Sequence, residues 1–217
     1  NNLSDYVRNA QIELEITGST HDERSISVSR GFYRTSDKKI VWNSSSLGDL
    51  ASIASGNSGR ARLSFSVKDP LPIKTVNDKN FSLNINARIS GFGTSDQFEN
   101  KEISDSVSKK IKIASRLQTA GTALYHSGPF ENSGPLPPKV GAETTYTIVW
   151  SLANNSNDFS DVRITASLPP YVSWTNLVSP FDSDIKFDEK DLSLVWNAGD
   201  VPAGTGIVMP ARKIFFQ

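Results

Sequence analysis

The chain has 217 residues, with 23 Lys and Arg, 23 Asp and Glu, two His and no Cys, so its formal net charge is zero. Such a chain can bury a core without disulfides or a structural metal, as one large domain or two small ones. Lack of cysteine excludes a disulfide scaffold, zinc–cysteine and iron–sulfur sites and thiol catalysis. The neutral balance argues against nucleic-acid binding, and no apolar run is long enough to span a membrane. Because the sequence starts at Asn1 without a leader, we expect a processed chain or a fragment whose targeting signal lies outside it.

Apolar and polar residues alternate with a period of two along most of the chain. Strand side chains leave on alternate faces, so each such segment has one apolar and one polar face. In chain order, the segments with this pattern are residues 12–16, 61–67, 81–89, 107–113, 146–152 and 162–168. The pattern predicts antiparallel sheets that bury their inner faces against each other as a sandwich.

Helical spacing of apolar residues is confined to residues 46–55, where Leu47, Leu50 and Ile53 fall on one side. Glycines interrupt and follow this stretch, so we expect one short helical turn at most. The other connections are rich in Gly, Pro, Asn, Asp and Ser, which is typical of turns.

An internal repeat is the most informative feature of the sequence. The segment around Trp42 recurs around Trp196, 154 positions later (196 − 42). The offset falls to 151 after the tryptophan, because residues 44–46 have no counterpart in the second copy. The further matches are Tyr33 with Phe187, Asp37 with Asp191, residues 48–50 with 199–201, residues 62–65 with 213–216, and residues 1–6 with 154–159. We infer that residues 1–66 and 154–217 are two copies of one segment.

A complete repeat would be longer than either copy. The first copy lacks a counterpart of the strand at 146–152, and the second lacks counterparts of the segments at 81–89 and 107–113. We therefore predict the C-terminal part of one domain, residues 1–116, joined to the N-terminal part of the next, residues 117–217. Partial domains leave sheet edges and inner faces unpaired. We expect the natural chain to continue at both ends, or a neighbouring molecule to complete each sandwich.

Four motifs carry a resemblance to a known family. They are PKVGAETTYTIVW at 138–150, NNSND at 154–158, LPPYVSW at 168–174 and WNAGDVP at 196–202. Together they resemble the conserved-repeat immunoglobulin-like domain of bacterial surface proteins, catalogued as domain of unknown function eleven. The likeness is closest to forms in large wall proteins of ultrasmall candidate-phylum bacteria. The resemblance implies an all-β fold of tandem immunoglobulin-like sandwiches on an exported, cell-surface or wall protein, with no assigned catalytic residues.

The aromatic residues have two interpretations. Trp42, Trp150 and Trp196 lie on the apolar faces of their segments, which favours a place in the core over a sugar-stacking platform. Trp174 follows two prolines that end sheet pairing, and its place stays open. The aromatics we single out as candidates for ligand contact are Trp174, Tyr171 and Tyr125.

No motif assigns a catalytic, cofactor or metal residue. His21 and His126 belong to no metal-binding or triad spacing, and we expect both to be exposed loop residues. An acidic run is weighed as a calcium site, because surface sandwiches often hold calcium between loop carboxylates, although such sites need several converging oxygens. It consists of Asp182, Asp184, Asp188, Glu189 and Asp191. We favour a solvated loop over calcium binding there.

Three functions remain after these exclusions. The first is a non-enzymatic structural module that extends a repetitive extracellular surface protein as a stalk, coat or fibre. The second is a module that binds glycans or host proteins, and the third is an accessory domain of an exported enzyme. As partners we expect neighbouring repeats and self-association through open sheet edges. The prolines of residues 134–138 favour a stiff connection, so we expect a semi-rigid rod.

Overall fold

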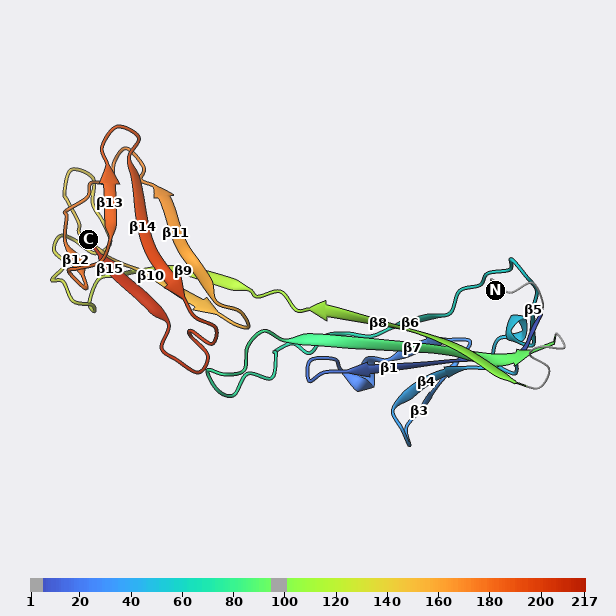
Figure 1. Ribbon diagram of the computed structural model, residues 1–217. Coiled ribbons are helices and arrows are strands. Elements are labelled where there is room, and N and C mark those ends of the chain that lie inside the picture. Colours follow the sequence, from blue (N-terminus) through green and yellow to red (C-terminus); the bar gives the residue numbers. More distant parts are fainter. Residues whose placement is uncertain (1–5, 95–100) are drawn as a thin grey trace. The chain divides into compact units, whose positions relative to one another are not determined.

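The computed structural model describes residues 6–94 and 101–217 of the chain. In these residues the fold is all-β, and every pair of named strands is antiparallel (Figure 1). The described helical elements are two 3-10 turns, η1 (Glu23–Ser25) and η2 (Gly48–Leu50). The turn η2 agrees with the expectation of a single helical turn within residues 46–55.

The chain divides into two compact units that interleave along the sequence. The first comprises Asn1–Pro72 and Phe81–Ile113, and the second comprises Ile73–Asn80 and Ala114–Gln217. The predicted boundary between residues 116 and 117 stays a prediction, as does the partial character of each domain.

The first unit contains a six-stranded sheet and a two-stranded sheet. Its strands are β1 (Val7–Thr17), β2 (Ser27–Ser29), β3 (Phe32–Arg34), β4 (Lys39–Trp42), β5 (Ser52–Ile53), β6 (Arg62–Ser64), β7 (Ser82–Gly93) and β8 (Glu102–Lys112). The large sheet has the order β3-β4-β1-β7-β8, with β5 also paired to β1, and the small sheet pairs β2 with β6. Strand β1 is therefore central, between β4 and β7 (Figure 1).

The second unit contains a four-stranded sheet and a three-stranded sheet. Its strands are β9 (Leu117–Leu124), β10 (Thr147–Asn154), β11 (Phe159–Ser167), β12 (Val178–Ser179), β13 (Ile185–Asp188), β14 (Ser193–Val201) and β15 (Arg212–Phe216). The two sheets have the orders β12-β15-β10-β9 and β11-β14-β13. Antiparallel sheets of this kind can form two β-sandwich halves, one in each unit.

The backbone pairing reproduces the sequence repeat around the two tryptophans. Strand β3 pairs with β4 through Arg34 and Lys39, and β13 pairs with β14 through Asp188 and Ser193, so one offset of 154 (188 − 34) relates both partners. The next strand also agrees, since Trp42 lies opposite Ile12 and Trp196 lies opposite Ile164. Thus β3, β4 and β1 correspond to β13, β14 and β11, an equivalence that follows from register alone.

Two unusual backbone conformations recur at equivalent places. The bulge in β1 contains Asn9 at φ 47°, and the bulge in β11 contains Asp161 at φ 53°. The hairpin loops likewise contain Lys38 at φ 56° and Leu192 at φ 53°. Positive φ is uncommon outside glycine, so its repetition at two matched places is strong support for two copies of one fold. Residues 1–5, part of the proposed repeat, lie outside the described residues.

The first copy is longer than the second between its tryptophan and the next strand pairing. Register equates Ile53, which lies opposite Val7, with Val201, which lies opposite Phe159, so 11 residues (53 − 42) stand in place of 5 (201 − 196), six more rather than the three that the sequence match predicts. In the second unit β14 runs without interruption from Trp196 to Val201, which pairs with Phe159 of β11. In the first unit the strand ends at Trp42, the chain forms η2, and the short β5 returns to pair with β1. The extra residues thus divide one strand into two without changing the order of the sheet.

Each unit has its own core between its two sheets. In the first, Ile40 and Trp42 are each 1% exposed and pack with Leu47 and Leu50 beneath Val28 and Leu63 of the small sheet. In the second, the core joins Leu194, Trp196 and Val201 of one sheet to Leu152, Ile214 and Phe216 of the other. The predicted apolar faces of residues 12–16, 146–152 and 162–168 are buried or half-buried, whereas Val67, Ile89 and Val107 of the other segments are exposed.

Candidate functional site

The most extensive polar cluster surrounds Asn154, where β10 ends and the chain turns toward β11. Its side chain is 1% exposed, and its Nδ2 donates to the carbonyl oxygens of Asn157 at 2.7 Å and Val201 at 2.9 Å. Its Oδ1 lies 2.7 Å from the hydroxyl of Ser115, which donates to it. A buried amide with every group paired fixes the turn firmly, since an unpaired group there costs about 1–3 kcal/mol.

Ser115 holds the other side of the same turn. Its hydroxyl accepts the backbone N–H groups of Ser156 and Asn157, both at 3.0 Å. The neighbouring Arg116 donates its backbone N–H to Oδ1 of Asn155 at 2.6 Å. These side-chain bonds tie the start of β9 to the end of β10, beside the backbone bond from the N–H of Asn155 to the carbonyl of Arg116 at 3.3 Å.

Asp158 completes the cluster with a charge. Its Oδ1 accepts the backbone N–H of Ala203 at 2.9 Å, and its Oδ2 pairs with Lys79 at 2.7 Å. The N–H of Ala203 and then Lys79 lower the pKa of Asp158 below its usual value. Asn80 donates its N–H to the carbonyl of Ser156 at 2.8 Å. These bonds join residues 73–80 to the turn between β10 and β11 and use the polar groups of the cluster, which indicates a structural role.

The acidic run considered for calcium is dispersed over local contacts. Asp184 accepts from Nδ2 of Asn197 at 2.8 Å, Asp188 from the N–H of Lys190 at 2.9 Å, and Asp191 from the N–H of Ser193 at 3.1 Å. Across residues 6–94 and 101–217, no group of three or more His, Cys, Asp or Glu side chains is arranged to hold a metal ion. Calcium binding at Asp182, Asp184, Asp188 or Asp191 gains no support from this geometry.

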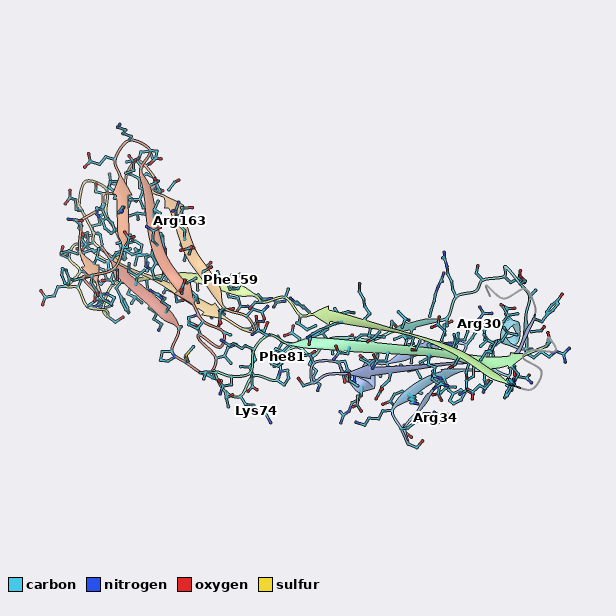
Figure 2. The ribbon with its side chains drawn as sticks, viewed as in Figure 1. Arg30, Arg34, Lys74, Phe81, Phe159 and Arg163 are labelled. Carbon is cyan, nitrogen blue, oxygen red and sulfur yellow. The ribbon has the colours of Figure 1, made fainter. Side chains whose placement is uncertain are left out.

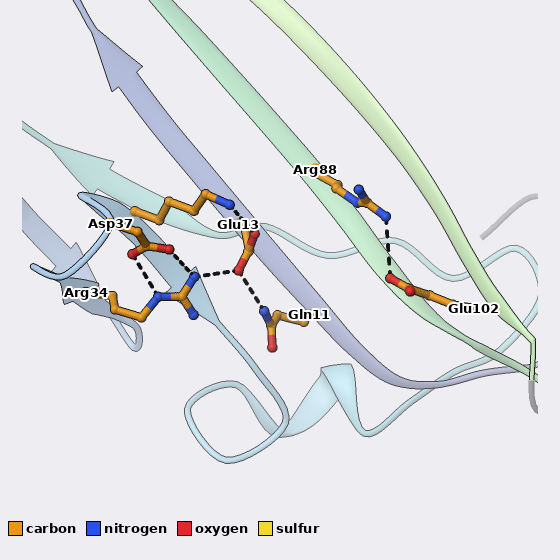
Figure 3. Close-up of polar contacts among 7 residues, drawn as sticks. Gln11, Glu13, Arg34, Asp37, Arg88 and Glu102 are labelled. Atoms are coloured by element: carbon orange, nitrogen blue, oxygen red, sulfur yellow. Dashed lines mark hydrogen bonds and ion pairs between the residues drawn. The ribbon is translucent and has the colours of Figure 1, made fainter.

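The first unit has a charged network on its large sheet (Figure 3). Glu13 accepts from Arg34 and from Lys39, each at 2.8 Å, and Arg34 also pairs with Asp37 at 2.6 Å. Hydrogen bonds from Lys39 and then Arg34 lower the pKa of Glu13. All members except Asp37 lie on adjacent strands, so the network joins β1, β4 and β3 across the face opposite the core.

A hollow of about 250 Å³ in the first unit collects arginines. It is lined by Ser29, Arg30, Leu47, Asp49, Arg60 and Arg62. Within the described part of the chain, none of these three arginine side chains forms an ion pair or hydrogen bond. Guanidinium groups bind carboxylate or phosphate well. All three arginines are exposed to solvent, however, so the hollow is not a preformed anion-binding site.

The aromatics divide between core and surface. Trp42 and Trp196 are 1% and 3% exposed, which confirms their predicted place in the core. Trp150 is half-buried against the core and meets Phe216 edge to face at 4.9 Å, so its predicted burial is only partly realised. Trp174 is also half-buried, and its ring stacks on Phe187 at 6.2 Å. These contacts give the four tryptophans packing roles.

The two tyrosines singled out for ligand contact differ in exposure and in their contacts. Tyr171, between β11 and β12, is 87% exposed, and Phe181, between β12 and β13, is 92% exposed. Tyr125 is half-buried, donates its hydroxyl to the carbonyl of Gly134 and lies against Tyr146 at 5.8 Å. Tyr171 therefore remains a candidate for ligand contact, whereas Tyr125 anchors its own loop.

One histidine prediction is wrong. His21 is 8% exposed, with Nδ1 at 2.9 Å from the carbonyl oxygen of Gly18 and its ring edge-on to Phe65 at 6.5 Å. The turn-like stretch beside Asp22 and Glu23 predicts an exposed residue, but an isolated bridge to Val67 brings the His21 ring against Phe65. His126 is exposed, as expected.

Comparisons with protein-family models, with curated proteins and with solved structures give no match to this chain. Among the described residues, no helix has the length and apolar character required to cross a bilayer.

Proposed function

We propose that this chain is a non-catalytic structural and interaction module, built from immunoglobulin-like repeats of a large bacterial surface protein. The observation that carries the proposal is the repeated register of β3, β4 and β1 in β13, β14 and β11. Repetition of a whole strand arrangement in one chain is typical of modules that act through number and spacing. The motifs at 138–150, 154–158, 168–174 and 196–202 support an extracellular, cell-surface or wall location.

The polar chemistry of the two units favours the same function. The buried amide of Asn154 and the carboxylates of Asp158 and Glu13 are all engaged in bonds that hold strands and turns. Enzymes need side chains whose hydrogen-bonding or acid–base capacity stays available to a substrate. In these three side chains that capacity is directed to the fold, as a structural or spacing element requires.

The repeat provides its own test, because the alignment sets how the chain continues in frame. Phe216 matches Phe65, so residues 67–217 appended after Gln217 add one complete repeat. We expect small-angle scattering from chains with one, two and three such additions to show a maximum dimension that rises in equal steps. A dimension that grows much more slowly, or a broad distribution of distances, would refute a semi-rigid stalk, coat or fibre.

A second candidate function is glycan or protein binding, favoured by the exposure of Tyr171 and Phe181. Exposed aromatic faces in loops are suited to stacking on sugars. A glycan array with the intact chain and with Tyr171→Ala tests it, and a signal lost in the variant supports binding at this loop. An array without signal would contradict glycan binding and leave the structural function as the remaining candidate.

A further inference from the structure

The equivalence of the two units shows which strands are missing beside β11. In the first unit β1 pairs with β4 on one side and with β7 on the other. Its counterpart β11 pairs with β14, and within residues 6–94 and 101–217 it has no strand on its other side (Figures 1 and 2). Figure 2 labels Phe159 and Arg163 on this strand. The edge of β11 that corresponds to the β7 side of β1 is therefore open.

The inner face of the opposite sheet is open at the same place in the fold. Trp150 is only half-buried although its ring packs against the core, and Gly121 pairs with it from β9. Thr119, Gly121 and Ala123 lie on this face of β9 and are exposed. The apolar face of β9 and β10 is thus continuous with the core but extends beyond the strands that cover it.

The first unit shows the converse arrangement. Its β7 and β8 continue the inner face past the small sheet, and there Ile89 is 38%, Val107 68% and Ile111 40% exposed. Among the described residues, the first unit therefore has the strand pair that the second lacks, and lacks the strands that would correspond to β9 and β10. The two open faces are complementary halves of one repeat.

We propose that the open edge of β11, together with the open face of β9 and β10, is a docking site for a β-hairpin with the sequence pattern of β7 and β8. The hairpin would add antiparallel to β11, supplied by a further repeat. This inference rests on the proposed function and names the partner through which one repeat engages the next. Main-chain bonds at such an edge give affinity, and alternate side chains set specificity.

The register of β1 with β7 predicts compatible neighbours at this site. Ile12, which lies opposite Ile89, corresponds to Ile164, and Leu14, which lies opposite Ala87, corresponds to Ala166. Apolar residues thus meet apolar residues on the inner face. On the outer face, Arg88 would meet Thr165, the counterpart of Glu13, so no like charges are opposed. A shift by one residue would expose every apolar side chain, so the register is strongly specified.

The test uses the full chain with a second copy of residues 67–113 appended after Gln217, the position at which β7 and β8 follow β6 in the first unit. Hydrogen exchange of peptides covering β11 is measured by mass spectrometry, with peptides covering β1 as an internal reference. Two matched variants are made in the appended copy only. Ala87→Asp places a charge on the inner face, and Asn86→Asp places the same charge on the exposed outer face.

We expect the extension to slow exchange in β11 by about tenfold or more, as for a strand that changes from edge to interior. The slowing should persist in Asn86→Asp and disappear in Ala87→Asp. Unchanged exchange in β11, or equal slowing in both Asp variants, would overturn the docking site. If docking fails while the scattering series still lengthens in equal steps, the proposed function stands and only the named partner is wrong.

Discussion

Trp42 is the side chain whose removal should damage the first unit most. It is 1% exposed, lies at the centre of the core with Ile40 and Leu50, and donates its indole N–H to the carbonyl of Ser29 at 3.0 Å. Truncation of a buried tryptophan to alanine costs about 3–5 kcal/mol through lost burial and the cavity left behind. The unpaired carbonyl of Ser29 adds about 1 kcal/mol. We therefore expect Trp42→Ala to lower the free energy of unfolding by about 4–6 kcal/mol.

The assay is urea unfolding, with hydrogen exchange to assign the loss to one unit. Trp42→Phe is the matched variant, because it keeps most of the ring but loses the donor to Ser29, so its cost should be well below that of alanine. Gly31 provides an independent check, since a Cβ there would lie 2.6 Å from Cδ1 of Trp42, and Gly31→Ala should destabilise the same unit. A loss below about 1 kcal/mol for Trp42→Ala, or equal losses for Ala and Phe, would refute the core assignment.

Three further changes test polar side chains that hold the fold. Glu13→Gln should lower stability at neutral pH. Lys39 and Arg34 lower the pKa of Glu13 in the folded protein, so its contribution to stability is full above its usual pKa of 4.5 and is lost as the pH falls through the folded value. The free energy of unfolding, measured in urea, should therefore fall less on acidification in the variant than in the unchanged chain. Thr20→Val should be neutral or stabilising in thermal unfolding, because the Thr20 hydroxyl is buried and has no hydrogen-bond partner among the described residues. A clear loss of stability would show that the hydroxyl is hydrogen-bonded. Asn154→Leu should cost about 2–4 kcal/mol in urea unfolding, since two carbonyls lose their donor, and an unchanged midpoint would contradict the role of this amide.

The strands and the repeat could be predicted from the sequence because they depend on short-range patterns. Alternation placed β1, β7, β8, β10 and β11 in their observed regions, although β6 (Arg62–Ser64) is shorter than the predicted 61–67. The match around Trp42 and Trp196 reappears as equal register in two hairpins. Side-chain alternation is fixed by the strand itself, so such features survive without knowledge of tertiary contacts.

Features that depend on distant contacts could not be predicted. Burial of His21 needs the bridge to Val67, and the half-burial of Trp150 depends on what covers β10 from the opposite sheet. The assignment of residues 73–80 to the second unit rests on Lys79 and Asn80, whose partners lie far along the chain at Asp158 and Ser156. No local pattern encodes these contacts, because burial and pairing are set by which segments meet in space.

The most direct test of the repeat as a mechanical and spacing module is to pull single molecules of the full chain extended by three in-frame copies of residues 67–217. Each copy adds 151 residues (217 − 66), and an extended chain spans at most about 3.6 Å per residue. Repeats that unfold one at a time should therefore give rupture events separated by equal increments of roughly 500 Å. Irregular increments, or smooth extension without rupture events, would contradict the account.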